Sequence, residues 1–175
     1  LPCPGAHIIA VDPAGRELPR GEVGELWIHG GSVIKGYWNN PRATAESFTA
    51  GYWHSGDLGS VDEQNFVRVF DRQKDMINRG GLKIYSAEVE SVLAGHPAVI
   101  ESAIVARPCP VLGERVHAVV VVRSDIDSPT LRAWCIERMS DYKVPETIDI
   151  STEPLPRNAN GKVMKKNLRD NLMDS

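Results

Sequence analysis

Short runs of β-branched and aromatic residues alternate with turn residues along the first part of the chain. Such runs predict strands, and the tight turns between them predict antiparallel neighbours. Asn40 followed by Pro41 predicts one short helix that ends near residue 48, because Asn caps a helix N-terminus and Pro suits the first turn. The last two of the expected strands flank the loop Asp-Glu-Gln-Asn and should form a hairpin. The strands are expected at residues 7–11, 24–29, 58–61 and 66–70.

The pattern of apolar positions changes after residue 71. Two short segments, 75–78 and 82–85, flank Arg-Gly-Gly and should pair as a hairpin. Ser86 is predicted to cap a helix, and Ser128 with Pro129 opens a second one. Further strands are expected at 99–106, 116–122 and 147–150, with a last helix after residue 162. The chain is therefore predicted to be α+β, with a β-rich part at residues 1–71 and an α+β part at residues 72–175.

The composition gives the protein no overall positive charge that would attract it to a polyanion. The 175 residues include 25% charged residues, and the formal net charge is −3. Nucleic acid or an anionic membrane would favour a strongly basic surface, so any anion site must be local. The longest apolar runs, such as residues 116–122, are far shorter than a membrane span.

Cysteine and histidine usage gives no sign of a metal site. Cys3, Cys109 and Cys135 are widely spaced, and the five histidines show no metal-ligand spacing. Small buried thiols in a reducing cytosol are the simplest interpretation, so we expect a cytoplasmic protein. The N-terminal sequence Leu-Pro-Cys-Pro-Gly has neither an initiator Met nor a leader-like segment, and we expect the chain to be a piece of a longer protein.

Two loops carry the candidate chemistry. Lys162 ends the Pro/Asn/Gly-rich segment 155–162, where a lysine can swing its ammonium to meet an anion as a movable point charge. Asp57 follows Ser-Gly, where a strand is predicted to end in a turn that exposes the carboxylate; such a group can accept hydrogen bonds from two vicinal hydroxyls. The alternatives are an ordinary turn before a helix for Lys162 and a solvated turn residue for Asp57.

Six short motifs follow one another along the chain. They are G-E-L at 24–26, G-Y-W at 36–38, S-G-D at 55–57, the stretch from D-R-Q-K-D to E-V-E at 71–90, Y-K-V-P at 142–145, and the loop that ends at Lys162. In this order they resemble the C-terminal third of an adenylate-forming enzyme, the superfamily of acyl-CoA synthetases, peptide-synthetase adenylation domains and beetle luciferases. Residues 71–90 and 110–122 look closest to bacterial fatty and medium-chain acyl-CoA ligases.

The resemblance implies a role for five residues. Asp57 matches the ribose-binding aspartate, and Arg72 matches an arginine that also contacts the nucleotide. Lys74 matches the hinge between a large N-terminal domain, of which residues 1–71 would be the last β-subdomain, and a small mobile C-terminal domain. Gly81 matches a glycine that lines the pantetheine tunnel. Lys162 matches the catalytic lysine that contacts the carboxylate substrate and the phosphate during adenylation.

Each implied role has a physical reason and a simpler alternative. An ammonium can stabilise the charge that develops when a carboxylate attacks a phosphate, and an arginine fork suits several oxygen acceptors. A glycine leaves space for a narrow pantetheine arm. The simpler alternative for Arg72 and Lys74 is a solvated charged turn, and for Gly80 and Gly81 it is hairpin geometry.

The resemblance also implies what the chain lacks. The Ser/Thr/Gly-rich phosphate loop, the segment that supports adenine and Mg²⁺, and most of the acid pocket would lie upstream. We therefore expect the chain alone to be inactive and the parent, meaning the longer protein expected to contain it, to be an AMP-forming acyl-CoA ligase that uses ATP, Mg²⁺, CoA and a fatty or medium-chain acid. The alternatives are an enzyme that loads the pantetheine of a carrier protein, and a non-catalytic binding module.

A cluster of basic residues around the last helix permits one more interpretation, a surface for RNA or lipid. The net charge of −3 and the order of the motifs favour a solvated helix face instead. The cluster consists of Arg157, Lys162, Lys165, Lys166 and Arg169.

Overall fold

The computed structural model describes residues 2–173. The chain divides into two compact units, of which the first ends at Lys74 and the second begins at Asp75. This division falls inside the segment after residue 71 where the apolar pattern changes. Both units combine strands with helices, so the predicted α+β class is confirmed.

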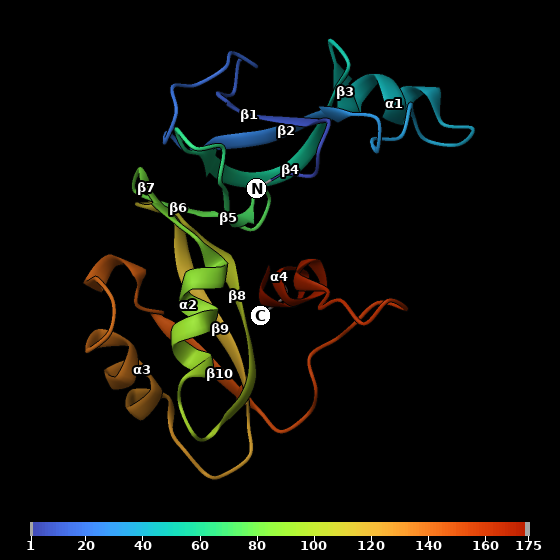
Figure 1. Cartoon of the computed structure of the whole chain (residues 1–175). Helices are drawn as coiled ribbons and strands as arrows, with labels where there is room; N and C mark the ends of the chain where they lie inside the picture. The colour runs from blue at the N-terminus through green and yellow to red at the C-terminus, as the bar shows by residue number, and fades with distance from the viewer. Residues whose placement is uncertain (1, 174–175) are drawn as a thin grey trace. The chain divides into compact units, whose positions relative to one another are not determined.

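Unit 1 is a five-stranded antiparallel sheet with one helix (Figure 1). β1 and β2 lie side by side, β2 pairs with the long β4, and β4 also pairs with β3 and β5. The helix α1 begins where the sequence predicted, because the Asn40 side chain accepts a hydrogen bond from the backbone of Ala43 at 3.0 Å. The elements are β1 (Ala6–Val11), β2 (Gly24–Gly30), α1 (Pro41–Ser47), β3 (Phe48–Thr49), β4 (Tyr52–Val61) and β5 (Val67–Arg72).

Side chains that alternate along β1 and β2 form two small cores, one on each face of this sheet. Ile9, Val11 and Trp27 are buried on one face. Ala10, Leu26 and Val61 are buried on the other. Successive residues of the two strands therefore contribute to the cores on opposite faces of the sheet.

Unit 2 is built on a second five-stranded sheet, in which the β8–β9 hairpin is the longest ladder. β10 pairs with β9 in parallel, and the short β6–β7 hairpin joins β9 through Arg79 and Gly113. Its strands are β6 (Ile77–Arg79), β7 (Leu82–Ile84), β8 (Val99–Cys109), β9 (Gly113–Val122) and β10 (Thr147–Ser151). Its helices are α2 (Ser86–Ala94), α3 (Ser128–Ile136), the 3-10 turn Asp141–Lys143 and α4 (Lys165–Met173).

The helices cover opposite faces of this sheet (Figure 1). Even-numbered residues of β9, such as Val116 and Val120, pack with α2 and α3 in the larger core. Odd-numbered Val121 packs with Leu168 of α4 and with Leu155 in a smaller core on the other face. Because a strand presents successive side chains to opposite faces, the valine-rich run of β9 serves both cores.

Ser86 does not cap α2 as predicted. The N-cap is Tyr85, whose side chain makes no capping hydrogen bond, and Ser86 is the first helical residue. Ser86 is fully buried, and its Oγ accepts a hydrogen bond from Nζ of Lys165 at 2.7 Å. The hydroxyl therefore links α2 to α4, a long-range partner that local sequence does not reveal.

Candidate functional site

Asp57 and Arg72 form an ion pair on neighbouring strands of unit 1. They are register partners on β4 and β5, and Nε of Arg72 lies 2.8 Å from Oδ1 of Asp57. The Nη1 group of Arg72 also donates to the carbonyl of Ser55 at 3.0 Å. Both side chains stay partly accessible, with 44% of Arg72 and 29% of Asp57 exposed. The pair thus presents carboxylate acceptors and guanidinium donors together.

The predicted turn at residues 55–57 is wrong, because these residues form a bulge within the continuous strand β4. Between the pairs Trp27–His54 and Glu25–Leu58, β4 has three residues and β2 has one. Gly56 lies at the centre of the bulge with φ of +69°, a conformation that glycine adopts readily. Turns and bulges both favour glycine, so the sequence indicated an irregular backbone here but did not distinguish a bulge from a turn.

Glu25, the middle residue of the G-E-L motif, supports this bulge, although the sequence alone assigned it no role. Its two carboxylate oxygens accept hydrogen bonds from the backbone of Gly56 at 3.1 Å and from the indole of Trp27 at 3.0 Å. The available signals were its place in that motif and a carboxylate in a mainly apolar strand. Glu25 fixes the backbone beside Asp57 and thereby the direction of that carboxylate.

The β6–β7 hairpin of unit 2 carries Gly80 and Gly81 at positive φ, +58° and +88°. The backbone of Gly80 donates to the carbonyl of Leu112 at 2.7 Å, and that of Gly81 donates to the Asn78 side chain at 3.0 Å. A Cβ built at Gly81 would meet no atom within 4 Å, whereas one at Gly80 would lie 3.4 Å from Leu112. Hairpin geometry alone therefore accounts for glycine at both positions, and the surface above Gly81 is open in this unit.

Lys74 is exposed in the turn between β5 and β6, the segment that joins the two units. Its neighbour Asp75 is largely buried, and its carboxylate Oδ1 lies 3.2 Å from Nη1 of Arg169 on α4. Unit 2 therefore begins at a residue that is tied to its last helix.

Lys162 ends a turn that the Asn158 side chain organises. Oδ1 of Asn158 accepts hydrogen bonds from the backbone of Asn160 at 3.1 Å and of Lys162 at 2.9 Å. The backbone of Asn158 donates in return to the carbonyl of Lys162 at 2.9 Å, and Gly161 adopts φ of +77°. The Lys162 residue is exposed, and its ammonium has no partner within residues 2–173. The turn thus holds the backbone while it leaves the cation accessible.

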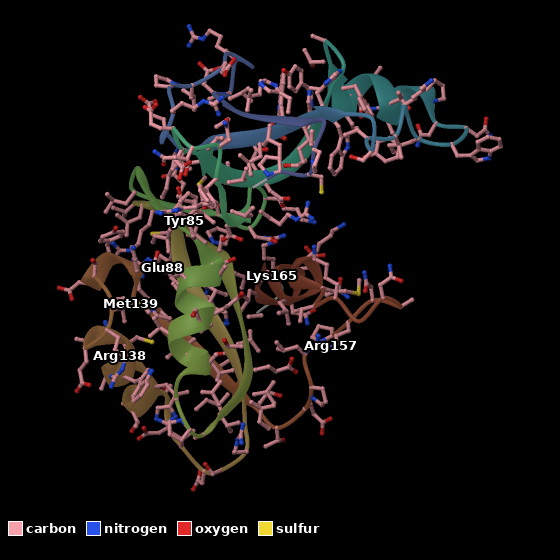
Figure 2. All side chains as sticks on the ribbon, viewed as in Figure 1. Tyr85, Glu88, Arg138, Met139, Arg157 and Lys165 are labelled. Carbon is pink, nitrogen blue, oxygen red and sulfur yellow. The ribbon has the colours of Figure 1, made fainter. Side chains whose placement is uncertain are left out.

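Three of the five basic residues around α4 are paired with carboxylates, which contradicts the prediction of a solvated helix face. Lys165 contacts Oε1 of Glu90 at 2.6 Å, Arg169 contacts Asp75, and Arg157 contacts Glu101. The side chains of Lys165 and Arg169 are only 15% and 25% exposed. Figure 2 shows Lys165 and Arg157 beside the body of unit 2. Carboxylates of unit 2 therefore pair with three of the five cations in this cluster.

Titratable residues outside these positions include one buried histidine and two buried cysteines. Nδ1 of His117 lies 2.7 Å from the Thr147 hydroxyl, and burial lowers the pKa of the imidazole. Cys109 and Cys135 are buried as expected, whereas Cys3 is exposed. Within the described residues, no group of three or more His, Cys, Asp or Glu side chains is placed to hold a metal ion. None of the helices described is long and apolar enough to cross a membrane.

Comparison with known proteins identifies the family. The family model "AMP-binding enzyme C-terminal domain" matches residues 88–162, a range that includes Lys162. A feruloyl-CoA synthase from Amycolatopsis is 45% identical over 90% of this chain and 32% of its own length. A fatty acid–[acyl-carrier-protein] ligase, ScoC, from Streptomyces coeruleorubidus is 39% identical over 97% of this chain and 33% of its own length.

Solved structures agree with the sequence comparison. The o-succinylbenzoate CoA synthetase from Bacillus subtilis, in complex with its acyl-adenylate intermediate, superposes with a TM-score of 0.89 at 36% identity. The match covers 99% of this chain and 35% of that protein. The chain thus spans about one third of the length of the relatives it matches. It belongs to the adenylate-forming enzymes, of which it represents the C-terminal portion, including their AMP-binding C-terminal domain.

Proposed function

We propose that the parent protein is an AMP-forming acid–thiol ligase that activates a carboxylic acid as acyl-AMP and transfers the acyl group to CoA. The observation that carries this proposal is the exposed ammonium of Lys162 on an ordered turn, beside Arg157 and Lys165, which are paired with carboxylates. An accessible ammonium suits the attack of a carboxylate on the α-phosphate of ATP, because it stabilises the negative charge shared by the two reacting groups.

In this proposal the other candidate residues bind the nucleotide, make room for the thiol substrate and allow the two units to change orientation. The Asp57 carboxylate would accept hydrogen bonds from the ribose hydroxyls, and Arg72 would donate to oxygens of the same nucleotide. Gly81 would leave room for the pantetheine arm in the thioester-forming state, and Lys74 would be the hinge about which the units change orientation. Their positions support this assignment: Asp57 and Arg72 form one accessible pair, and the surface above Gly81 is open.

Mg²⁺ would be held by the region upstream of this chain. Among the described residues, no cluster of acidic side chains is placed to bind a divalent cation. In the parent, the ion would neutralise charge on the ATP phosphates. Lys162 would stabilise the negative charge on the attacking carboxylate and the phosphate that it attacks.

The acid is proposed to be a fatty or medium-chain acid, and the parent to work in the cytoplasm. The relatives named above act on different acids and different thiols, since one is a feruloyl-CoA synthase and another a fatty acid–[acyl-carrier-protein] ligase. Both thiols end in pantetheine, so Gly81 serves either acceptor equally. Loading of a carrier protein is therefore the second candidate. Assays of the parent with a graded series of fatty acids and with ferulate, each with CoA and with holo-carrier protein, separate these possibilities.

The central test replaces Lys162 by Ala in the parent protein. Loss of one preorganised transition-state donor lowers a rate by about 10²–10³. We expect that loss in acid-dependent ATP–pyrophosphate exchange, whereas thioester formation from supplied acyl-AMP should continue.

Lys166→Ala is the matched control, because Lys166 is likewise exposed and without a partner among the described residues. It should leave both half-reactions near the rates of the unmodified enzyme. Equal loss of both half-reactions in Lys162→Ala would mean that Lys162 is structural. No acid-dependent exchange with any acid, even in the unmodified parent, would favour a non-catalytic binding module.

A further inference from the structure

A chain of contacts connects strand β8 to the residue that precedes Lys162. Oε1 of Glu101 accepts a hydrogen bond from the backbone of Leu155 at 2.9 Å, and Oε2 forms an ion pair with Arg157. Nη1 of Arg157 then donates to the carbonyl of Gly161 at 2.7 Å. One carboxylate therefore holds the start of the loop directly and its far end through the guanidinium.

A β-bulge explains why Glu101 faces this loop. The β8–β9 register shifts between Val99 and Glu101. Val99 packs in the core beneath α2 and α3, whereas Ala103 packs in the core beneath α4. In a regular strand residues 99, 101 and 103 would share one face, so the bulge moves the side chain at 101 to the α4 side.

The loop at residues 155–163 is held by core packing at its two ends and by polar contacts of Arg157 between them. Leu155 is 4% exposed and belongs to the core beneath α4, and Val163 packs against the same core. Between them, Arg157 forms an isolated bridge with Val163 and spans the turn to Gly161. The Arg157 side chain is 45% exposed and that of Glu101 is 20% exposed. A pair with this much exposure adds little to global stability, so its main effect is on the geometry of the loop.

We propose that Glu101 and Arg157 are positioning residues that hold the Lys162 turn in the geometry required for adenylation. The inference rests on the proposed function of Lys162. Arg157 matters here as a bridge rather than as a charge, because its fork binds the Glu101 carboxylate and the Gly161 carbonyl at the same time.

Two variants of the parent protein test the bridge. Glu101→Gln keeps an acceptor for Leu155 but loses the ion pair, and Arg157→Lys keeps the charge but loses the fork. We expect each to lower acid-dependent ATP–pyrophosphate exchange by about 10- to 100-fold, the scale of a misplacement of about 1 Å. Thioester formation from acyl-AMP should not change. The matched control is Glu88→Gln, which breaks the pair with Lys143 (2.6 and 2.8 Å) on another part of unit 2.

A readout of mechanism comes from combining variants. In a Lys162→Ala background, Glu101→Gln should cause no further loss of exchange, because it acts only through Lys162. Hydrogen exchange of the backbone amides of Asn158, Gly161 and Lys162, which are hydrogen-bonded in the turn, should become faster in Glu101→Gln and stay unchanged in Glu88→Gln.

The outcomes separate this inference from the proposed function. The positioning role is overturned if Glu101→Gln and Arg157→Lys adenylate normally while Lys162→Ala does not, or if Glu101→Gln lowers the rate by its full factor in the Lys162→Ala background. Normal adenylation by Lys162→Ala would contradict the proposed function itself. In that case, hydrogen exchange still tests whether Glu101 and Arg157 hold the loop in place. Faster exchange in Glu101→Gln would support this structural role, and unchanged exchange would overturn it.

Discussion

Gly81 offers a substitution in which backbone strain and side-chain size can be separated. Its φ of +88° is unfavourable for any L-residue with a Cβ, so Ala and Leu should both lower the free energy of unfolding by about 1–2 kcal/mol. A Cβ at this position meets no atom within 4 Å, so Leu should cost no more stability than Ala in the structure as it stands. Any further difference between the two variants must come from a state in which something fills the open space.

The proposed function places the pantetheine arm in that space during thioester formation. A leucine side chain there would clash with the arm, and overpacking of this kind costs about 1–3 kcal/mol of free energy. This penalty corresponds to about 5- to 150-fold in rate. We therefore expect Gly81→Leu to slow thioester formation from acyl-AMP by this factor, Gly81→Ala to slow it much less, and both variants of the parent to keep ATP–pyrophosphate exchange.

The matched control is Gly21→Leu in unit 1. Gly21 has φ of +87°, and a Cβ there would also meet no atom within 4 Å. It should lose the same stability in urea unfolding without a selective effect on either half-reaction. The reasoning is refuted if Gly81→Ala and Gly81→Leu slow thioester formation equally, or if exchange falls as far as thioester formation. Gly80 and Gly81 would then serve the hairpin alone.

Two further predictions concern the hinge and the buried histidine. Lys74→Pro in the parent should slow thioester formation while exchange continues, because Pro fixes φ near −65° and restricts Gln73; equal loss in both half-reactions would contradict a hinge. Burial lowers the pKa of His117, so the unfolded chain binds the extra proton more readily and stability should fall as the pH drops below about 6.5. Urea unfolding followed by far-UV circular dichroism should show a smaller loss from pH 7.5 to 5.5 in His117→Gln, and an identical loss would exclude His117 as the source.

Elements set by local signals were predicted well. The Asn40 cap, the hairpin formed by β4 and β5, and the valine-rich strand at residues 116–122 all depend on residues close in sequence. The strands themselves extend further than predicted: β4 begins at Tyr52, and β8 continues to Cys109. Pairing with a long partner strand keeps these ends extended, and a short window of sequence does not include the partner.

Features that depend on distant partners were missed for the same reason. Ser86 is a common capping residue, but its hydroxyl accepts from Lys165, which lies on another helix. Lys165 and Arg169 were expected on a solvated helix face, and only the fold places Glu90 and Asp75 opposite them. The bulges in β4 and β8 likewise require knowledge of both strands in each pair. The strand pairings that direct the side chains of Asp57 and Glu101 could therefore not be predicted from a short window of sequence.

Long-range pairings also set the electrostatic surroundings of Lys162. Arg157, Lys165 and Arg169 are held by carboxylates from β8, from α2 and from the first residue of unit 2. Without those carboxylates, several cations near one turn would repel one another and compete for the same anion. With them, the nearby charges are fixed in place and α4 is fastened to both helix α2 and the start of the unit. Under the proposed function, a phosphate at this surface would meet the exposed ammonium of Lys162 on a turn whose backbone is already ordered, the arrangement that preorganised charge stabilisation requires.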